Sequence, residues 1–187
     1  MTSYNVAGFA LESKLPIDER FDRAPNLDAC VTYGADATIA LAGIECKFCE
    51  PYSRTKKQLS ARYMASELAP LWNGRPHVRS LAEACCTGNS GYQHLGVPQL
   101  LKHLLGLRRR GAGRQTHLLY LYFDGTGAAA ERHRDEISRF GSAVASDGVG
   151  FSAVSYQTVM ARLAPYRDHH RSWFEYMSTR YFAETVC

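Results

Sequence analysis

Apolar and polar positions alternate along residues 33–50, and this pattern predicts two short strands joined by a turn. Because residues two apart on a strand point to the same side, Glu45 and Lys47 share one face and Cys46 points to the other. Ile44 lies on the face of Cys46, and we expect that face to be the interior one. An acid and a base next to each other on an apolar strand are unfavourable in a core and suit a functional site.

Hydrophobic spacing in the rest of the chain predicts strands that alternate with helices. Two strand-then-helix units favour a parallel pair with right-handed crossovers beside an antiparallel hairpin. The predicted strands are residues 27–31, 117–124 and 150–155. The predicted helices are residues 55–71, 78–84, 97–107, 128–145, 156–163 and 172–183, preceded by a short helical turn around residues 15–21.

Asp36, Glu45 and Lys47 together have the chemistry needed to hydrolyse a phosphodiester. A divalent cation offsets the phosphate charge and lowers the pKa of a water, and Mg²⁺ is held by one or two carboxylates. A lysine beside the ion can orient the water and stabilise developing negative charge. We therefore expect the two carboxylates to converge on one ion.

The turn between the two strands decides whether the carboxylates of Asp36 and Glu45 can lie close together. A two-residue turn at residues 42–43 would leave Asp36 four residues out of register with Glu45, roughly 13 Å at ~3.3 Å per residue. A wider loop through residues 39–42 would bring the two carboxylates together, and we expect that loop.

The order Asp36, then Glu45-Cys46-Lys47, resembles the signature of the PD-(D/E)XK nuclease superfamily, with Ala35 in the place of the signature proline. The resemblance implies an α/β fold, a restriction-endonuclease-like mixed β-sheet core (αβββαβ) flanked by helices, with a helical insert after the Glu-x-Lys strand. It implies that both carboxylates and the backbone carbonyl of Cys46 bind Mg²⁺, with Mn²⁺ as a substitute, and that Lys47 positions the water.

Many members of this superfamily carry a further glutamate on an early helix near the metal. Glu12 and Glu19 are both candidates for that role here, and the sequence does not choose between them.

The composition is that of an ordinary globular protein, and we expect residues 1–187 to form one nuclease-like domain. Hydrophobic residues make up 45% of the chain and charged residues 21%, as in soluble proteins. No apolar run approaches the length of a membrane span, and the first residues lack the pattern of a secretion signal. We expect a cytoplasmic protein with no membrane partner.

The net charge of +4 is mild, but the basic residues gather in two places, which favours a nucleic-acid partner. The residues that we expect to contact phosphates are Arg54, Lys56 and Lys57 after the Glu-x-Lys strand, and Arg108, Arg109 and Arg110 in a later basic loop. Taken singly, each cluster is equally compatible with a solvated surface.

Six cysteines are present, and without a secretion signal we expect them to be reduced. An alternative function would use Cys46, Cys49, Cys85 and Cys86 as four thiolate ligands of zinc. The adjacent residues Cys85 and Cys86 are an unfavourable pair of ligands for one zinc ion.

Three polar residues in the helical insert, His94, Gln99 and His103, could reach the site, although a structural role is the more common one for a histidine. The aromatic helix at residues 172–183 is compatible with a homodimer surface. The sequence thus favours a Mg²⁺-dependent DNA endonuclease. The alternative is a catalytically inactive nuclease-fold module that binds nucleic acid or protein.

Overall fold

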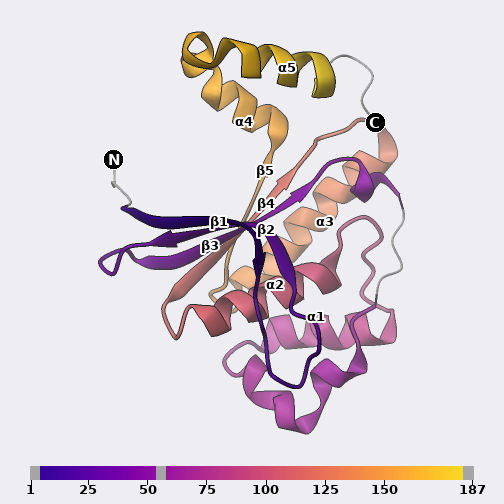
Figure 1. Ribbon diagram of the computed structural model, residues 1–187. Helices are drawn as coiled ribbons and strands as arrows, with labels where there is room; N and C mark the ends of the chain where they lie inside the picture. Colours follow the sequence, from indigo (N-terminus) through magenta and orange to yellow (C-terminus); the bar gives the residue numbers. More distant parts are fainter. Residues whose placement is uncertain (1–4, 54–57, 183–187) are drawn as a thin grey trace.

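The computed structural model describes residues 5–53 and 58–182 of the chain, and its strands form one mixed five-stranded sheet in the order β1-β2-β3-β4-β5 (Figure 1). The first three strands are antiparallel neighbours, whereas β3, β4 and β5 run parallel. The strands are β1 (Val6–Lys14), β2 (Asn26–Tyr33), β3 (Ile39–Lys47), β4 (Gln115–Tyr122) and β5 (Gly150–Ser155).

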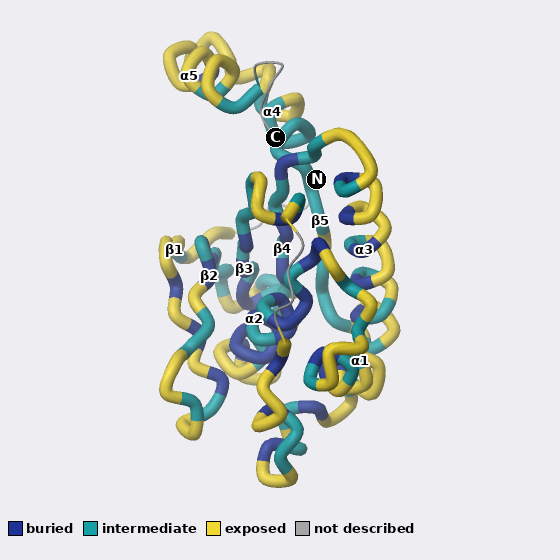
Figure 2. The backbone as a smooth tube through the Cα atoms, turned by 90° about the vertical axis from the view of Figure 1, so that its right-hand side faces the viewer, coloured by how far each residue is buried: buried dark blue, intermediate teal, exposed yellow. Residues whose placement is uncertain are grey.

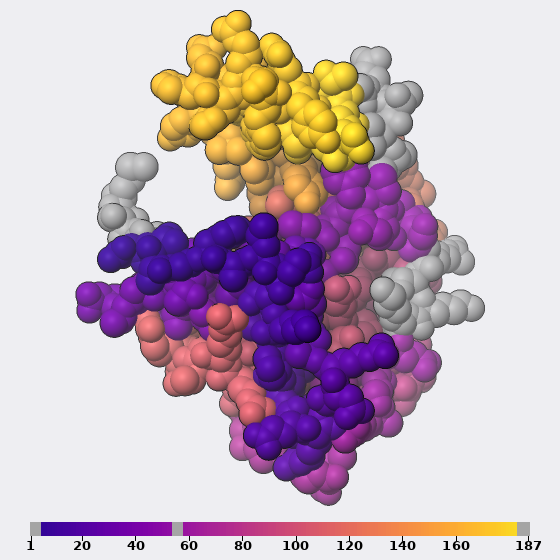
Figure 3. Space-filling model, in the orientation of Figure 1, coloured from indigo at the N-terminus to yellow at the C-terminus, as the bar shows by residue number. Residues whose placement is uncertain are grey.

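Helices occupy the two crossovers between the parallel strands and the end of the chain. They are α1 (Pro76–Thr87), α2 (Val97–Arg110), α3 (Gly127–Ala145), α4 (Tyr156–Leu163) and α5 (Arg171–Tyr181). Figure 2 shows α1, α2 and α3 over the same side of the sheet. In Figures 1 and 3, α4 and α5 form a projection above the strands. The core therefore lies between one sheet face and the first three helices.

The sheet register identifies that core-facing side of β3. Gly43 is paired with Leu118, and Glu45 with Tyr120, and all four residues are buried. Because side chains alternate, Ile44 and Cys46 point to the other face. The expectation that Ile44 and Cys46 face the interior was therefore wrong, and it is the acidic residue that faces the core.

Glycines allow α2 to pack closely against the rest of the core. A Cβ atom on Gly43 of β3 would come within 3.0 Å of Leu107 Cδ1 on α2. On α2 itself, a Cβ atom on Gly106 would come within 2.8 Å of the carbonyl oxygen of Leu15. A larger residue at Gly106 would require a shift of the backbone, whereas at Gly43 the leucine side chains would have to move.

Most predicted elements are confirmed, with the boundaries given above, and the mixed α/β sheet is that of a restriction-endonuclease-like fold. Two regions differ. The predicted helix at residues 55–71 is replaced, where it is described, by the short 3₁₀ helices η2 (Ala61–Met64) and η3 (Ser66–Trp72). Residues 15–21, where a helical turn was predicted, follow β1 and form no helix, so the leading helix of αβββαβ is not found among the described residues.

Among the helices that the structure describes, none combines the length and the apolar character that crossing a bilayer requires.

The 3₁₀ helix η1 (Glu50–Tyr52) follows β3, and η4 (Ala164–His170) joins α4 to α5.

The two helix-interior glycines, Gly106 in α2 and Gly141 in α3, offer a matched test of this packing. We expect Gly106→Ala to lower the free energy of unfolding by about 1–3 kcal/mol, because its methyl group meets backbone atoms of Leu15. At Gly141 the nearest atom would be 3.6 Å away, so Gly141→Ala should raise stability by up to about 1 kcal/mol through helix propensity. Urea denaturation measures both, and equal effects would contradict the close approach.

The burial of His133 in α3 makes the free energy of unfolding depend on pH. The residue is fully buried, its Nε2 lies 3.1 Å from Tyr120 Oη, and burial lowers its pKa to about 4. The charged and titratable groups that act on it are Glu136, His94, Asp124 and Arg134. Between pH ~6.5 and about 4 the unfolded chain binds a proton here that the folded chain does not, so stability falls as pH drops through this window.

We expect His133 to account for up to about 3 kcal/mol of that loss. His133→Gln, which cannot gain the proton, should be less sensitive to acid than the wild type. Urea denaturation of both proteins at pH 7.5 and pH 4.5 measures the difference, and parallel losses would show that this histidine is not responsible.

Candidate active site

The Glu45 carboxylate lies on the core-facing side of β3 and is 1% exposed. Lys47 Nζ is 2.6 Å from Glu45 Oε1, and Gln99 Nε2 of α2 donates a hydrogen bond to the same oxygen at 2.6 Å. His103 Nε2, one turn further along α2, lies 3.0 Å from Glu45 Oε2, within ion-pair range although the angles are not those of a hydrogen bond. Groups from two elements thus surround one buried acid.

These contacts decide the charge states of Glu45 and Lys47. Burial by itself raises the pKa of Glu45, but the contacts with His103 and Lys47 outweigh burial and hold that pKa below its ordinary value. Burial by itself lowers the pKa of Lys47, but Glu45 outweighs it and raises that pKa. At neutral pH the site therefore holds a carboxylate and an ammonium side by side.

Asp28 of β2 supplies the second carboxylate. The antiparallel register pairs Ala29 with Ile44, so that Asp28 and Glu45 are the next residues of β2 and β3 beyond this pair. Its Oδ2 accepts a hydrogen bond from the backbone N–H of Cys46 at 2.6 Å. The pKa of Asp28 is raised, first by burial and further by the charge of Glu45, although the Cys46 N–H opposes both. Two mutually repelling carboxylates on adjacent strands favour a bound cation.

Asp36 does not lie at this site, contrary to the sequence expectation. It is exposed in the turn at residues 34–38 that joins β2 to β3. Residues 39–42 continue as strand and do not form the expected loop, so Glu45 is six residues beyond the start of β3, roughly 20 Å at ~3.3 Å per residue. The hairpin is formed with the strand that contains Asp28, and this residue takes the place expected for Asp36.

The backbone carbonyl of Cys46 remains a predicted ligand. The residue lies between Glu45 and Lys47, so its side chain points away from the site and only its backbone can take part. Of the two early glutamates, Glu12 is the nearer to the site. It lies on β1 beside β2, its charge adds to the raised pKa of Asp28, and its carboxylate accepts a hydrogen bond from Asn26. Glu19 lies 3.8 Å from Arg109 instead.

The predicted phosphate contacts divide into two groups. Arg54, Lys56 and Lys57 lie outside the described residues. The other three arginines form the last turn of α2 rather than a loop, roughly 14–16 Å along the helix from Gln99. Each donates a hydrogen bond within the protein, Arg108 to the Leu71 carbonyl, Arg109 to the Ile17 carbonyl and Arg110 to the Ser13 hydroxyl. These bonds anchor α2 to neighbouring segments.

The cysteines do not form the alternative zinc site. In the part of the chain that the structure describes, no group of three or more His, Cys, Asp or Glu side chains could hold a metal ion. Cys46, Cys85 and Cys86 carry free thiols, whereas Cys49 is in a disulfide, which differs from the expectation that all the cysteines are reduced.

Asp28 and Glu45 nevertheless fit a hard cation such as Mg²⁺. Mg²⁺ is commonly held by only one or two carboxylates and takes water and substrate phosphate oxygens as its other ligands. These two carboxylates lie on neighbouring strands, and the pKa of Asp28 is raised by burial and further by the charge of Glu45, so the pair is such a donor set.

Gln99 and His103 are the residues whose role sequence reasoning understated. Their spacing of four places them on the same face of one helix, which is the signal that could have paired them. Asp28 was missed although its strand was predicted. A lone acid among the apolar residues of a predicted strand is the signal that could have found it.

A family model described as the PD-(D/E)XK nuclease superfamily matches residues 22–183 of the 187. The match includes Asp28, Glu45, Lys47 and the α2 residues around them. Searches of curated proteins and of solved structures found no match.

The assignment of Asp28, and not Asp36, to the candidate site can be tested by metal binding without any substrate. We expect Asp28→Asn to weaken Mn²⁺ binding at least tenfold, because a charged hard ligand is lost. Asp36→Asn, the matched control, should bind as the wild type does. Isothermal titration calorimetry with Mn²⁺ measures both, and the reverse ranking would restore Asp36 to the site.

Proposed function

The chain belongs to the PD-(D/E)XK nuclease superfamily, and on this basis we propose that it is a metal-dependent endonuclease that hydrolyses phosphodiester bonds in DNA. The observation that carries the proposal is the proximity of Asp28, Glu45 and Lys47, near the start of β2 and at the end of β3. Mg²⁺, or Mn²⁺ in its place, supplies charge neutralisation at the phosphate and a more acidic water when bound.

Each residue has a distinct task in this proposal. Asp28 and Glu45 hold the cation, together with the Cys46 carbonyl. Lys47 has its pKa raised, so it works as a fixed ammonium and not as a base, orienting the attacking water and stabilising negative charge on the phosphate. Gln99 and His103 act through Glu45 and fix the direction of its carboxylate.

The same contacts favour one competing function. Both Glu45 oxygens already have partners, Lys47 and Gln99 on one and His103 on the other. A metal must share or displace them. A catalytically inactive nuclease-fold module that binds nucleic acid or protein would keep this closed arrangement as a purely structural network.

A cleavage assay separates the two functions. We expect Mg²⁺, and also Mn²⁺, to support the cutting of plasmid or oligonucleotide DNA, and EDTA to stop it. Lys47→Ala should reduce the rate by about 10²–10³, the typical loss on removing one group that stabilises transition-state charge. Lys14→Ala, an exposed lysine at the end of β1, is the control and should cut normally. Cutting that survives Lys47→Ala, or no cutting with either ion, would contradict the proposal.

A further inference from the structure

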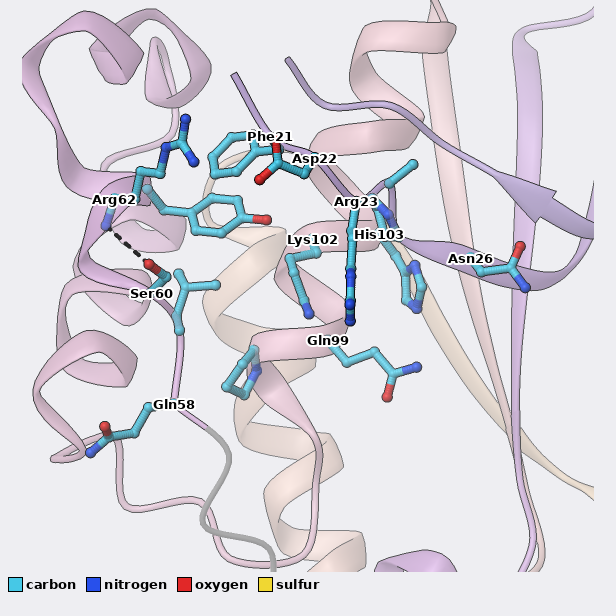
Figure 4. A pocket seen from close by; sticks show the side chains of 15 residues that line it. Phe21, Asp22, Arg23, Asn26, Gln58, Ser60, Arg62, Gln99, Lys102 and His103 are labelled. Atoms are coloured by element: carbon cyan, nitrogen blue, oxygen red, sulfur yellow. Dashed lines mark hydrogen bonds between the residues drawn. The ribbon is translucent and has the colours of Figure 1, made fainter. Parts of the chain in front are cut away.

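A hollow of about 820 Å³ opens directly beside the candidate active site. Gln99 and His103, which contact Glu45, are also part of its wall. Its other walls come from the segment between β1 and β2 and from residues 58–63. Figure 4 shows the side chains of Arg23, Lys102 and His103 pointing in the same direction. The catalytic carboxylate is therefore one side chain away from an open space.

The hollow is cationic. Arg23, Arg62 and Lys102 line it, against a single carboxylate from Asp22. Arg23 and Arg62 are exposed, and Lys102 is half-buried on α2. Positive groups around a concave surface attract phosphates, and the attraction depends strongly on salt. The charge thus favours an anionic ligand beside the metal site.

One wall of the hollow contains two aromatic residues, Phe21 and Tyr63. The rings of Phe21 and Tyr63 are stacked with centroids 4.3 Å apart, and the Arg62 guanidinium lies 5.4 Å from the centre of the Phe21 ring. Unpaired bases contact aromatic rings and guanidinium planes of this kind. A site that bound only phosphate would not need aromatic rings in its wall.

A buried polar atom of His103 also suits contact with a nucleotide base. His103 is 1% exposed and lines the hollow, and its Nδ1 has no hydrogen-bond partner among the described residues. Gln99 stands beside it with its amide bonded to Glu45. Amide and imidazole groups at the inner end of a pocket are suited to read the edge of a base.

The size of the hollow limits what can enter. Pockets of about 300–1,000 Å³ hold ligands the size of one or two nucleotides. A base within a duplex is stacked and paired, so it reaches a pocket only when the strand is single or when the base is extruded at an energetic cost. We propose that this hollow binds an unpaired nucleotide next to the scissile phosphate, so that the substrate is DNA with a single-stranded segment. This inference rests on the proposed nuclease function and narrows its substrate class.

Binding in EDTA tests the hollow without any chemistry. The ligands are a fluorescein-labelled single-stranded oligothymidylate of twelve nucleotides and a hairpin duplex of equal charge, and fluorescence anisotropy measures their affinities at several salt concentrations. The double variant Arg23→Gln, Lys102→Gln should bind the single strand at least tenfold more weakly, with a salt slope smaller by about 1.4, or ~0.7 per lost phosphate contact.

The matched control is Arg162→Gln, Arg167→Gln, which removes two charges from exposed positions on α4 and η4. It should leave single-strand binding within twofold of the wild type. Duplex binding should change equally little in both double variants. Unchanged single-strand affinity in the hollow variant, or equal losses for single strand and duplex, would overturn the inference.

The cleavage assay separates this inference from the proposed function. If Lys47-dependent cutting occurs but the hollow variant binds single strands normally, the inference fails and the nuclease proposal stands. If the hollow variant loses single-strand affinity as expected but no DNA is cut, the nuclease proposal fails and the nucleotide-binding hollow stands.

Discussion

The structure depends on a buried carboxylate that must be kept ionised. Glu45 faces the core at 1% exposure, where an unpaired charge would cost several kcal/mol. Lys47, Gln99 and His103 offset that cost, and two of these three come from α2. The crossover helix must therefore lie close over β3. Close packing through Gly43 and Gly106 helps to make that position available, so the site and the core constrain each other.

The same constraint explains why Asp28 is where it is. The register of the β2–β3 hairpin brings a second carboxylate close to Glu45, and the Cys46 N–H holds it in place. The pKa of Asp28 is raised, first by burial and further by the charge of Glu45. A protein that needed only a stable sheet would gain nothing from this repulsion. Its physical use is to bind positive charge, and we see it as the basis of the proposed metal site.

The sequence predicted the part of the site that is local and missed the part that depends on pairing. Glu45 and Lys47 share a face because of strand alternation alone, and the periodicity of α2 and α3 gave their extents closely. Asp36 was assigned to the site, and Asp28 was not considered, because the position of the hairpin turn follows from interstrand packing, which no local pattern records. The segment at residues 55–71 has a helical pattern but contains Pro70, and its described part forms 3₁₀ turns.

One helix links the proposed chemistry to the choice of substrate. Gln99 and His103 contact Glu45 and also line the hollow, and Lys102 stands between them in sequence. The three arginines at the other end of α2 anchor it to the segments around Leu71, Ile17 and Ser13. A ligand in the hollow would therefore contact the same rigid element that orients the acid. An unpaired nucleotide in the hollow would lie one side chain away from Glu45.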